Sequence, residues 1–228
     1  MFVYYGRKKQ TARLYPDPVH PVIVEPFAGS AAYSLFSSRW QKQVILVEKD
    51  AQIVALWRWL IEEATEQDIR ALPDPVQGEL TAEVWHLLAM FSKRWFTYRK
   101  ATATPMMVAS WKACKPYMAA NVYKVKHWQI IEGDYTDAPD IEATWFIDPP
   151  YRGEPGTGYR HGSDLIDYES LARWVEARKG AVIACEGTGA DWLPFVPLAT
   201  LSTAAGKKHD ELVYLQGISD DPIGDLFR

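Results

Sequence analysis

The sequence predicts an α/β fold: a seven-stranded, mostly parallel sheet with one reversed strand in a hairpin at its edge, plus a small helical insert. Short apolar, β-branched runs bounded by Gly, Pro or acidic residues alternate with helical patterns, as in repeated βαβ units. The 228 residues are 48% hydrophobic and 24% charged, which is typical of a globular chain long enough to bury a core.

The apolar runs are continuous, which is typical of strands buried on both faces of a sheet. They cover residues 22–25, 44–48, 128–132, 144–148, 181–185, 196–201 and 211–216. Helical patterns lie between several of them, at residues 30–39, 51–64 and 168–179. The loop between the last two runs is too short for a crossover helix, so we expect these two strands to form an antiparallel hairpin.

An insert of residues 66–127 interrupts this alternation and is predicted to be a helical subdomain, with helices at 82–96 and 107–119. Residues 1–65 and 128–228 then form the main domain. The formal net charge of −4 hides an asymmetry, because residues 84–131 contain no Asp or Glu but eight Lys and Arg. A basic segment on an acidic body indicates an anionic polymer as partner.

Several classes of protein are excluded by composition. No apolar run approaches the roughly 18 residues of a membrane span, and the N-terminus lacks the apolar segment of a signal peptide. Cys114 and Cys185 are too few and too far apart for a disulfide framework or a metal site, and no nucleophilic triad is evident. We therefore expect a soluble cytoplasmic protein without a metal or a membrane partner, and a monomer because no self-complementary stripe is evident.

The strongest functional signal is the tetrapeptide Asp148-Pro149-Pro150-Tyr151 at the end of the fourth predicted strand. Ligands of open α/β sheets bind outside the carboxyl ends of the strands. A carboxylate, a rigid proline carbonyl and an aromatic ring suit a planar amine, because they provide two acceptors and a stacking face. A Pro-Pro turn with a buried tyrosine is the structural alternative, but chance produces this tetrapeptide in only about one of a thousand such chains.

Three weaker signals follow other strands. The segment VEPFAGSA (24–31) runs from a strand into a turn of small residues and then a predicted helix, where a backbone can approach a negative ligand group. Glu48 ends the second strand, where an acid can bind a ribose diol, and Asp134 follows the third, where it could accept a bond from an adenine amine. Taken singly, each is equally well explained as an ordinary turn or an exposed acid.

Together these motifs resemble the adenine-specific DNA methyltransferases of the Dam type, especially their small phage-like members. The matching motifs, in order, are YYGRK (4–8), VEPFAGS (24–30), VEKD (47–50), GDY (133–135) and DPPY (148–151), with 167–195 and 207–214 similar to later motifs. The resemblance covers nearly the whole chain except the insert. Where the family usually has a second glycine in its first two motifs, this sequence has Arg7 and Ala31.

The resemblance implies a Rossmann-like class I methyltransferase that uses S-adenosylmethionine and no metal. The cofactor-binding residues it implies are Tyr5, Lys8, Glu25, Phe27, Ala28, Gly29, Ser30, Ala31, Glu48, Lys49, Asp134, Tyr135 and Asp148. The methionine end would lie near Lys8 and the 25–30 turn, the ribose on Glu48 and the adenine near Asp134. The implied catalytic residues are Asp148, Pro149, Pro150 and Tyr151, which hold and stack on a target adenine flipped out of the duplex.

We expect DNA contacts from two segments. In the acid-free segment, the cations expected to contact phosphate are Lys93, Arg94, Arg99, Lys100, Lys112 and Lys115, whereas most aromatic residues there are better explained as core. The glycine-rich loop after the catalytic turn suits a flap over the extruded base, with Tyr159, Arg160 and His161 as candidate strand contacts. A solvated loop is an equal alternative for these three.

Other functions stay open at this point. The target could be the 4-amino group of cytosine or an adenine in RNA, although the resemblance favours DNA adenine because Asp148 replaces the Ser more common in cytosine-amine enzymes. A protein-glutamine methyltransferase is less favoured, since it leaves the basic insert unexplained. A nucleic-acid-binding module without activity is the alternative from another class, and Arg7 and Ala31 are the arguments for it.

Overall fold

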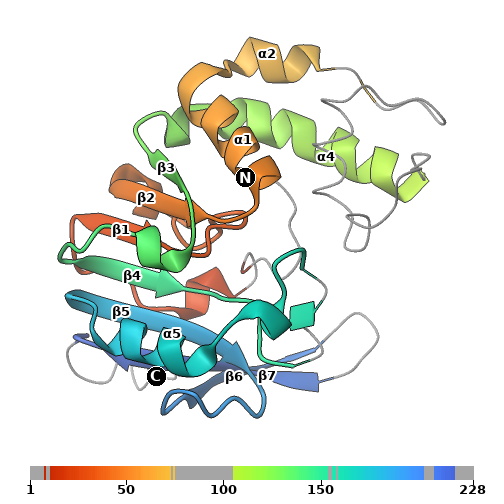
Figure 1. Cartoon of the computed structure of the whole chain (residues 1–228). Helices are drawn as coiled ribbons and strands as arrows, with labels where there is room; N and C mark the ends of the chain where they lie inside the picture. Colours follow the sequence, from red (N-terminus) through yellow and green to blue (C-terminus); the bar gives the residue numbers. More distant parts are fainter. Residues whose placement is uncertain are drawn as a thin grey trace.

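The centre of the molecule is a seven-stranded sheet, within the part of the chain that the computed structural model describes: residues 8, 11–72, 74, 105–153, 156–157, 159–202 and 208–218. The strands lie side by side in the order β3-β2-β1-β4-β5-β7-β6 (Figure 1). Their bounds are β1 Val22–Glu25, β2 Gln43–Glu48, β3 Gln129–Glu132, β4 Ala143–Ile147, β5 Gly180–Gly187, β6 Val196–Ser202 and β7 Lys208–Gln216. The predicted α/β sheet is confirmed.

The first five strands are parallel, and β7 runs antiparallel to both β5 and β6. The predicted terminal hairpin therefore exists, but its reversed strand β7 lies inside the sheet and β6 forms the edge. Pro197 explains this order, because proline has no backbone N–H to donate to a neighbouring strand. It is therefore confined to edge strands or bulges. The β6–β7 register shifts between Pro197 and Ala199.

Both faces of the sheet are buried, as the continuous apolar runs predict. Successive side chains of a strand point to opposite faces, so Phe146 packs in the cluster that contains Trp57, whereas Trp145 packs in the cluster that contains Leu171. Trp57 belongs to α1 and Leu171 to α5, which therefore cover opposite faces (Figure 1). The bounds are α1 Ala51–Arg58, extended by a π-helical turn Trp59–Glu63, and α5 Tyr168–Glu176.

The helix predicted at residues 30–39 does not form. Instead the chain makes a series of turns, because Gly29, Ala31 and Ser37 have φ angles of 44°, 48° and 53°, which a right-handed helix excludes. The backbone N–H of Ser34 donates to Glu25 Oε1 rather than to a helical carbonyl. No helix begins at the small-residue turn, so the expected preference of a helix N-terminus for an anion at that place is wrong.

The described part of the insert is helical and packs on the main core. It contains α2 (Glu66–Ala71), α4 (Pro105–Asn121) and a 3-10 turn, and α4 includes the helix predicted at 107–119. Trp111 and Met118 of α4 are fully buried in the same cluster as Trp57. The helix predicted at 82–96 lies outside the described residues. Among the described helices, none is long and apolar enough to cross a lipid bilayer.

Candidate functional site

A cavity of about 280 Å³ opens at the carboxyl ends of β1, β2, β3 and β4. The sheet order runs outward in opposite directions from β1 and β4, which makes this edge a topological switch point. Every predicted cofactor residue that the structure describes lines this cavity: Lys8, Glu25, Phe27, Ala28, Gly29, Ser30, Ala31, Glu48, Lys49, Asp134, Tyr135 and Asp148. Tyr5 lies outside the described residues. The fold thus brings together side chains from five separate motifs.

The turn after β1 is held from both sides. The Ala28 N–H donates to the Val47 carbonyl at 3.1 Å, and the Gly29 carbonyl accepts from Trp57 Nε1 at 2.9 Å. Glu25 accepts a bond from Ser34 at 2.9 Å, but burial outweighs this bond and raises the pKa of Glu25 to about 7. The turn therefore presents a buried acid whose charge depends on pH near neutrality.

Glu48 connects the ends of β1 and β2. One carboxylate oxygen accepts from the Gly29 N–H at 3.0 Å, and the other accepts from the N–H groups of Lys49 and Asp50, both at 2.9 Å. Burial raises the pKa of Glu48, and the three backbone bonds oppose this rise. Each carboxylate oxygen can accept more than one bond, so this geometry is compatible with a diol ligand.

An aromatic pair lies at the β3 end of the cavity. The rings of Phe27 and Tyr135 are stacked with centroids 5.6 Å apart and an interplanar angle of 26°. Beside them, Lys49 Nζ lies 2.5 Å from Asp134 Oδ2, and Asp134 also accepts from the Tyr135 N–H. The predicted adenine acceptor is therefore already bound to a lysine, while the aromatic pair offers a surface for a planar ring.

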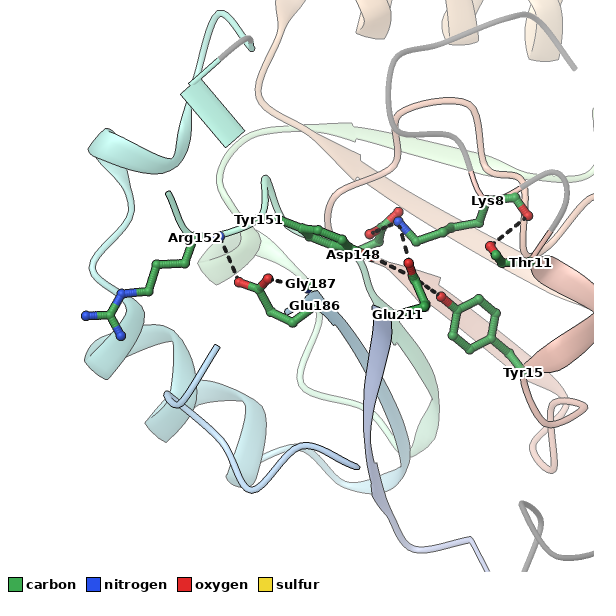
Figure 2. A network of polar contacts seen from close by, with 9 residues as sticks. All are labelled: Lys8, Thr11, Tyr15, Asp148, Tyr151, Arg152, Glu186, Gly187 and Glu211. Carbon is green, nitrogen blue, oxygen red and sulfur yellow. Dashed lines mark hydrogen bonds and ion pairs between the residues drawn. The ribbon is translucent and has the colours of Figure 1, made fainter. Parts of the chain in front are cut away.

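The predicted catalytic carboxylate is paired with a lysine from the start of the chain. Lys8 Nζ lies 2.6 Å from Asp148 Oδ1 and 3.7 Å from Glu211 Oε1 (Figure 2). Burial raises the pKa of Asp148 to about 6, although Lys8 opposes the rise. Burial alone would lower the pKa of Lys8, but Asp148 and Glu211 outweigh it and raise this pKa. Lys8 is therefore held between two acidic side chains, at hydrogen-bond distance from Asp148 and farther from Glu211.

The rest of the tetrapeptide is fixed by hydrogen bonds. The Pro150 carbonyl accepts from the Tyr168 hydroxyl at 2.6 Å, and Pro149 is buried. The Tyr151 hydroxyl donates to Glu211 Oε1 at 2.6 Å, and Lys8 Nζ lies 4.5 Å from the centre of the Tyr151 ring. Both the ring and the turn that carries it are thus held in place by side chains distant in the sequence.

Two buried acids in this site were missed by the sequence analysis as functional residues. Glu186 on β5 is 1% exposed and accepts from the Arg152 N–H, and Glu211 on β7 is 3% exposed and accepts from Tyr15 and Tyr151 (Figure 2). Each borders an apolar run. An acid next to a buried strand was the available signal in the sequence. Acids are almost never fully buried unless they are paired, so such a position indicates a partner or a functional role.

The predicted DNA contacts fall in different places. Tyr159, Arg160 and His161 line the cavity itself, and Arg160 lies 3.4 Å from Asp50. Lys112 is exposed on α4, whereas Lys115 donates to the Leu72 carbonyl and to Asp74. Four other predicted contacts, Lys93, Arg94, Arg99 and Lys100, lie outside the described residues.

Comparison with known proteins does not assign the chain to a family. No protein-family model and no curated protein matches the chain. Among the described residues, no group of three or more His, Cys, Asp and Glu is arranged to hold a metal ion. The functional conclusion therefore rests on the site.

Proposed function

We propose that this protein transfers a methyl group from S-adenosylmethionine to the exocyclic 6-amino group of adenine in DNA. One observation carries the proposal: the motifs around Glu25, Glu48, Asp134 and Asp148, far apart in the sequence, line one cavity at the switch point of the sheet. Within the described residues, the seven-stranded sheet with its one reversed strand is compatible with the Rossmann-like class I methyltransferase fold that the sequence resemblance implies.

The residues around the cavity fit S-adenosylmethionine by their chemistry. Glu48, at the tip of β2, suits the ribose hydroxyls, and the stacked pair of Phe27 and Tyr135 suits the adenine ring. Lys8 offers a positive charge to a carboxylate, and Glu25 in its ionised form offers a negative charge to an ammonium group. When bound, this cofactor supplies a methyl group that is already activated by a positively charged sulfur. The contribution of the protein to the rate is then the positioning of the amine against that methyl group.

The chain's own residues orient the amine that receives the methyl group. Asp148 accepts one N–H and the Pro149 carbonyl accepts the other, since the Pro150 carbonyl is already bonded to Tyr168. The carboxylate also stabilises the positive charge that develops on the nitrogen, and the methylated amine becomes neutral by losing one proton to solvent. With a pKa of about 6, Asp148 is mostly ionised at neutral pH, and the Tyr151 ring stacks on the base.

The polymer is proposed from the charge distribution. The segment 84–131 carries eight Lys and Arg without any acid, in a chain whose net charge is −4. Of these cations, Lys112 is exposed on α4. An adenine amine inside a duplex is not accessible in line with the donor, so the base must be extruded and the phosphates around it held by cations.

The proposal is tested by incubating the protein with unmethylated DNA and labelled S-adenosylmethionine, followed by mass spectrometry of the nucleosides. Methyladenine is expected, with a loss of at least about 100-fold in Asp148→Ala, because charge stabilisation at the reacting nitrogen is lost. Asp140→Ala is the matched control, since Asp140 is exposed and pairs with Lys179 away from the cavity. This control should keep the full rate.

Other outcomes select the alternatives. Detection of methylcytosine would show that the target is the 4-amino group of cytosine and not the adenine amine. Cofactor binding by calorimetry without any DNA product would direct the search to RNA or protein substrates. Absence of cofactor binding would overturn the enzyme proposal in favour of a nucleic-acid-binding module.

A further inference from the structure

Tyr151 is held at three points of the molecule. Its hydroxyl donates to Glu211 Oε1 at 2.6 Å, and the next backbone N–H, that of Arg152, donates to Glu186 Oε1 at 2.8 Å. The ring also lies against Gly187, where an added Cβ would be only 2.9 Å from Tyr151 Cδ2. Figure 2 shows the ring between the two glutamates. The contacts define both the position and the direction of the ring.

The reversed strand explains how Glu211 reaches this place. Glu211 pairs with Gly187 in the antiparallel β5–β7 ladder, so the beginning of β7 lies at the carboxyl end of β5. A parallel strand in the same position would bring its end rather than its beginning to the site. The residue that faces Tyr151 is therefore determined by the direction of β7.

Glu211 is bonded as a positioning residue would be. It is 3% exposed, and its Oε1 accepts from the hydroxyls of both Tyr15 and Tyr151. Lys8 Nζ lies 3.7 Å away and compensates its charge. Neither Glu211 nor Tyr151 lines the cavity, whereas Lys8 does, so an effect of Glu211 on a ligand passes through the residues that it contacts.

We propose that Glu211 is a positioning residue for the target base: it holds the Tyr151 ring, against Gly187, in the orientation that stacks on the extruded base. This inference rests on the proposed function, because it needs a planar base beside Asp148. It assigns to Glu211 a role in recognition of the base and not in binding of the cofactor. The β5–β7 pair thereby becomes part of the base-binding site.

The test is a double-mutant cycle between Glu211→Gln and Tyr151→Phe, with initial rates on unmethylated plasmid DNA and cofactor affinity by calorimetry. Tyr151→Phe keeps the ring but loses the hydroxyl, and kcat/KM for DNA should fall about tenfold, the effect of a hydrogen bond to a charged group. In Glu211→Gln alone, kcat/KM for DNA should fall severalfold. When Glu211→Gln is added to Tyr151→Phe, the further fall in kcat/KM should be less than about twofold. Cofactor affinity should stay within about twofold in each variant.

Two further variants keep the test decisive. Gly187→Ala places a methyl group against the Tyr151 ring and leaves the Glu211 carboxylate chemically unchanged, and it should reproduce the loss in kcat/KM for DNA. Tyr214→Phe is the matched control on the same strand, because its hydroxyl bonds only Gln216 among the described residues, and it should keep the wild-type rate. Thermal unfolding confirms that each variant folds.

The outcomes separate this inference from the function on which it rests. If the wild-type protein methylates DNA but the two losses multiply, or if Glu211→Gln weakens cofactor binding as much as DNA methylation, Glu211 acts through Lys8 and the inference is overturned. If the wild-type protein transfers no methyl group to DNA, the proposed function fails and this inference with it.

Discussion

Lys8 and Asp148 are 140 positions apart in the sequence and form an ion pair of 2.6 Å at the carboxyl edge of the sheet. The side chain of Lys8 is 8% exposed and that of Asp148 is 20% exposed. Such a pair is costly to bury, and removing one partner leaves the other as an uncompensated charge. Lys8, near the start of the chain, and the turn of residues 148–151 are therefore energetically linked.

Substitution of Lys8 by Met should change the pH dependence of methyl transfer. The pKa of Asp148 is about 6 with Lys8 opposing its rise, so removal of the lysine raises this pKa further. Since the reaction needs the carboxylate, the acid limb of the pH–rate profile should move to higher pH and the rate at pH 7 should fall. The profile is measured from about pH 5 to 9, beside Lys179→Met, which removes an exposed lysine. An unshifted acid limb would contradict the linkage.

Glu25 should make the cofactor-free protein less stable at high pH. Its folded-state pKa of about 7 lies above its ordinary value of 4.5, so its stabilising contribution is full below about pH 4.5 and is lost as the pH rises through 7. Glu25→Gln should therefore be more stable than the wild type at pH 8, by about 3 kcal/mol at most, and nearly equal at pH 5.

Urea unfolding at both pH values measures this difference, because the midpoint reports the free energy of unfolding. Glu66→Gln is the control, since Glu66 is exposed and pairs only with Arg70 among the described residues. A gain in Glu25→Gln of the same size at pH 5 and pH 8 would contradict the raised pKa.

Ala31 should tolerate glycine and reject valine. With φ at 48°, this alanine has a left-handed conformation that costs an L-residue about 1–2 kcal/mol. A glycine at this position relieves that cost, and the relief offsets what the variant loses in chain entropy and methyl burial. Ala31→Gly should change the free energy of unfolding by less than about 1 kcal/mol, and Ala31→Val should lose more than about 2 kcal/mol. Denaturant unfolding checks both, and a clear loss in the glycine variant would favour the helix that the sequence predicts.

Substitutions of Lys112 and Lys115 should distinguish a lysine that contacts DNA from one that stabilises the packing of α4. Lys115 donates to the Leu72 carbonyl at 2.7 Å and lies 2.9 Å from Asp74, whereas Lys112 is exposed. Lys115→Met should lower the free energy of unfolding by about 1 kcal/mol, through loss of these bonds. Lys112→Met should leave stability unchanged, weaken DNA binding and reduce the slope of log K against log salt by about 1. An unchanged salt dependence would remove Lys112 from the DNA contacts.

The sequence by itself determined where the strands lie and which of their ends carry the site. Every strand begins and ends within three residues of its predicted bounds, because strands buried on both faces need continuous apolar runs. Glu25, Glu48 and Asp148 could be placed at one edge for a related reason: the carboxyl ends of parallel strands meet there. Local pattern is sufficient for both conclusions.

Only the tertiary structure decided how the chain behaves between these strands and which acids face each other. Residues 30–39 have a helical pattern, yet they do not form a helix. The Ser34 N–H donates to buried Glu25, and Gly29, Ala31 and Ser37 have left-handed backbone angles. Glu211 meets Tyr151 because β7 is reversed and pairs with β5 in a register that places it opposite Gly187. Register between distant strands and the burial of a charge depend on the packing of the whole sheet, and no local window of sequence contains them.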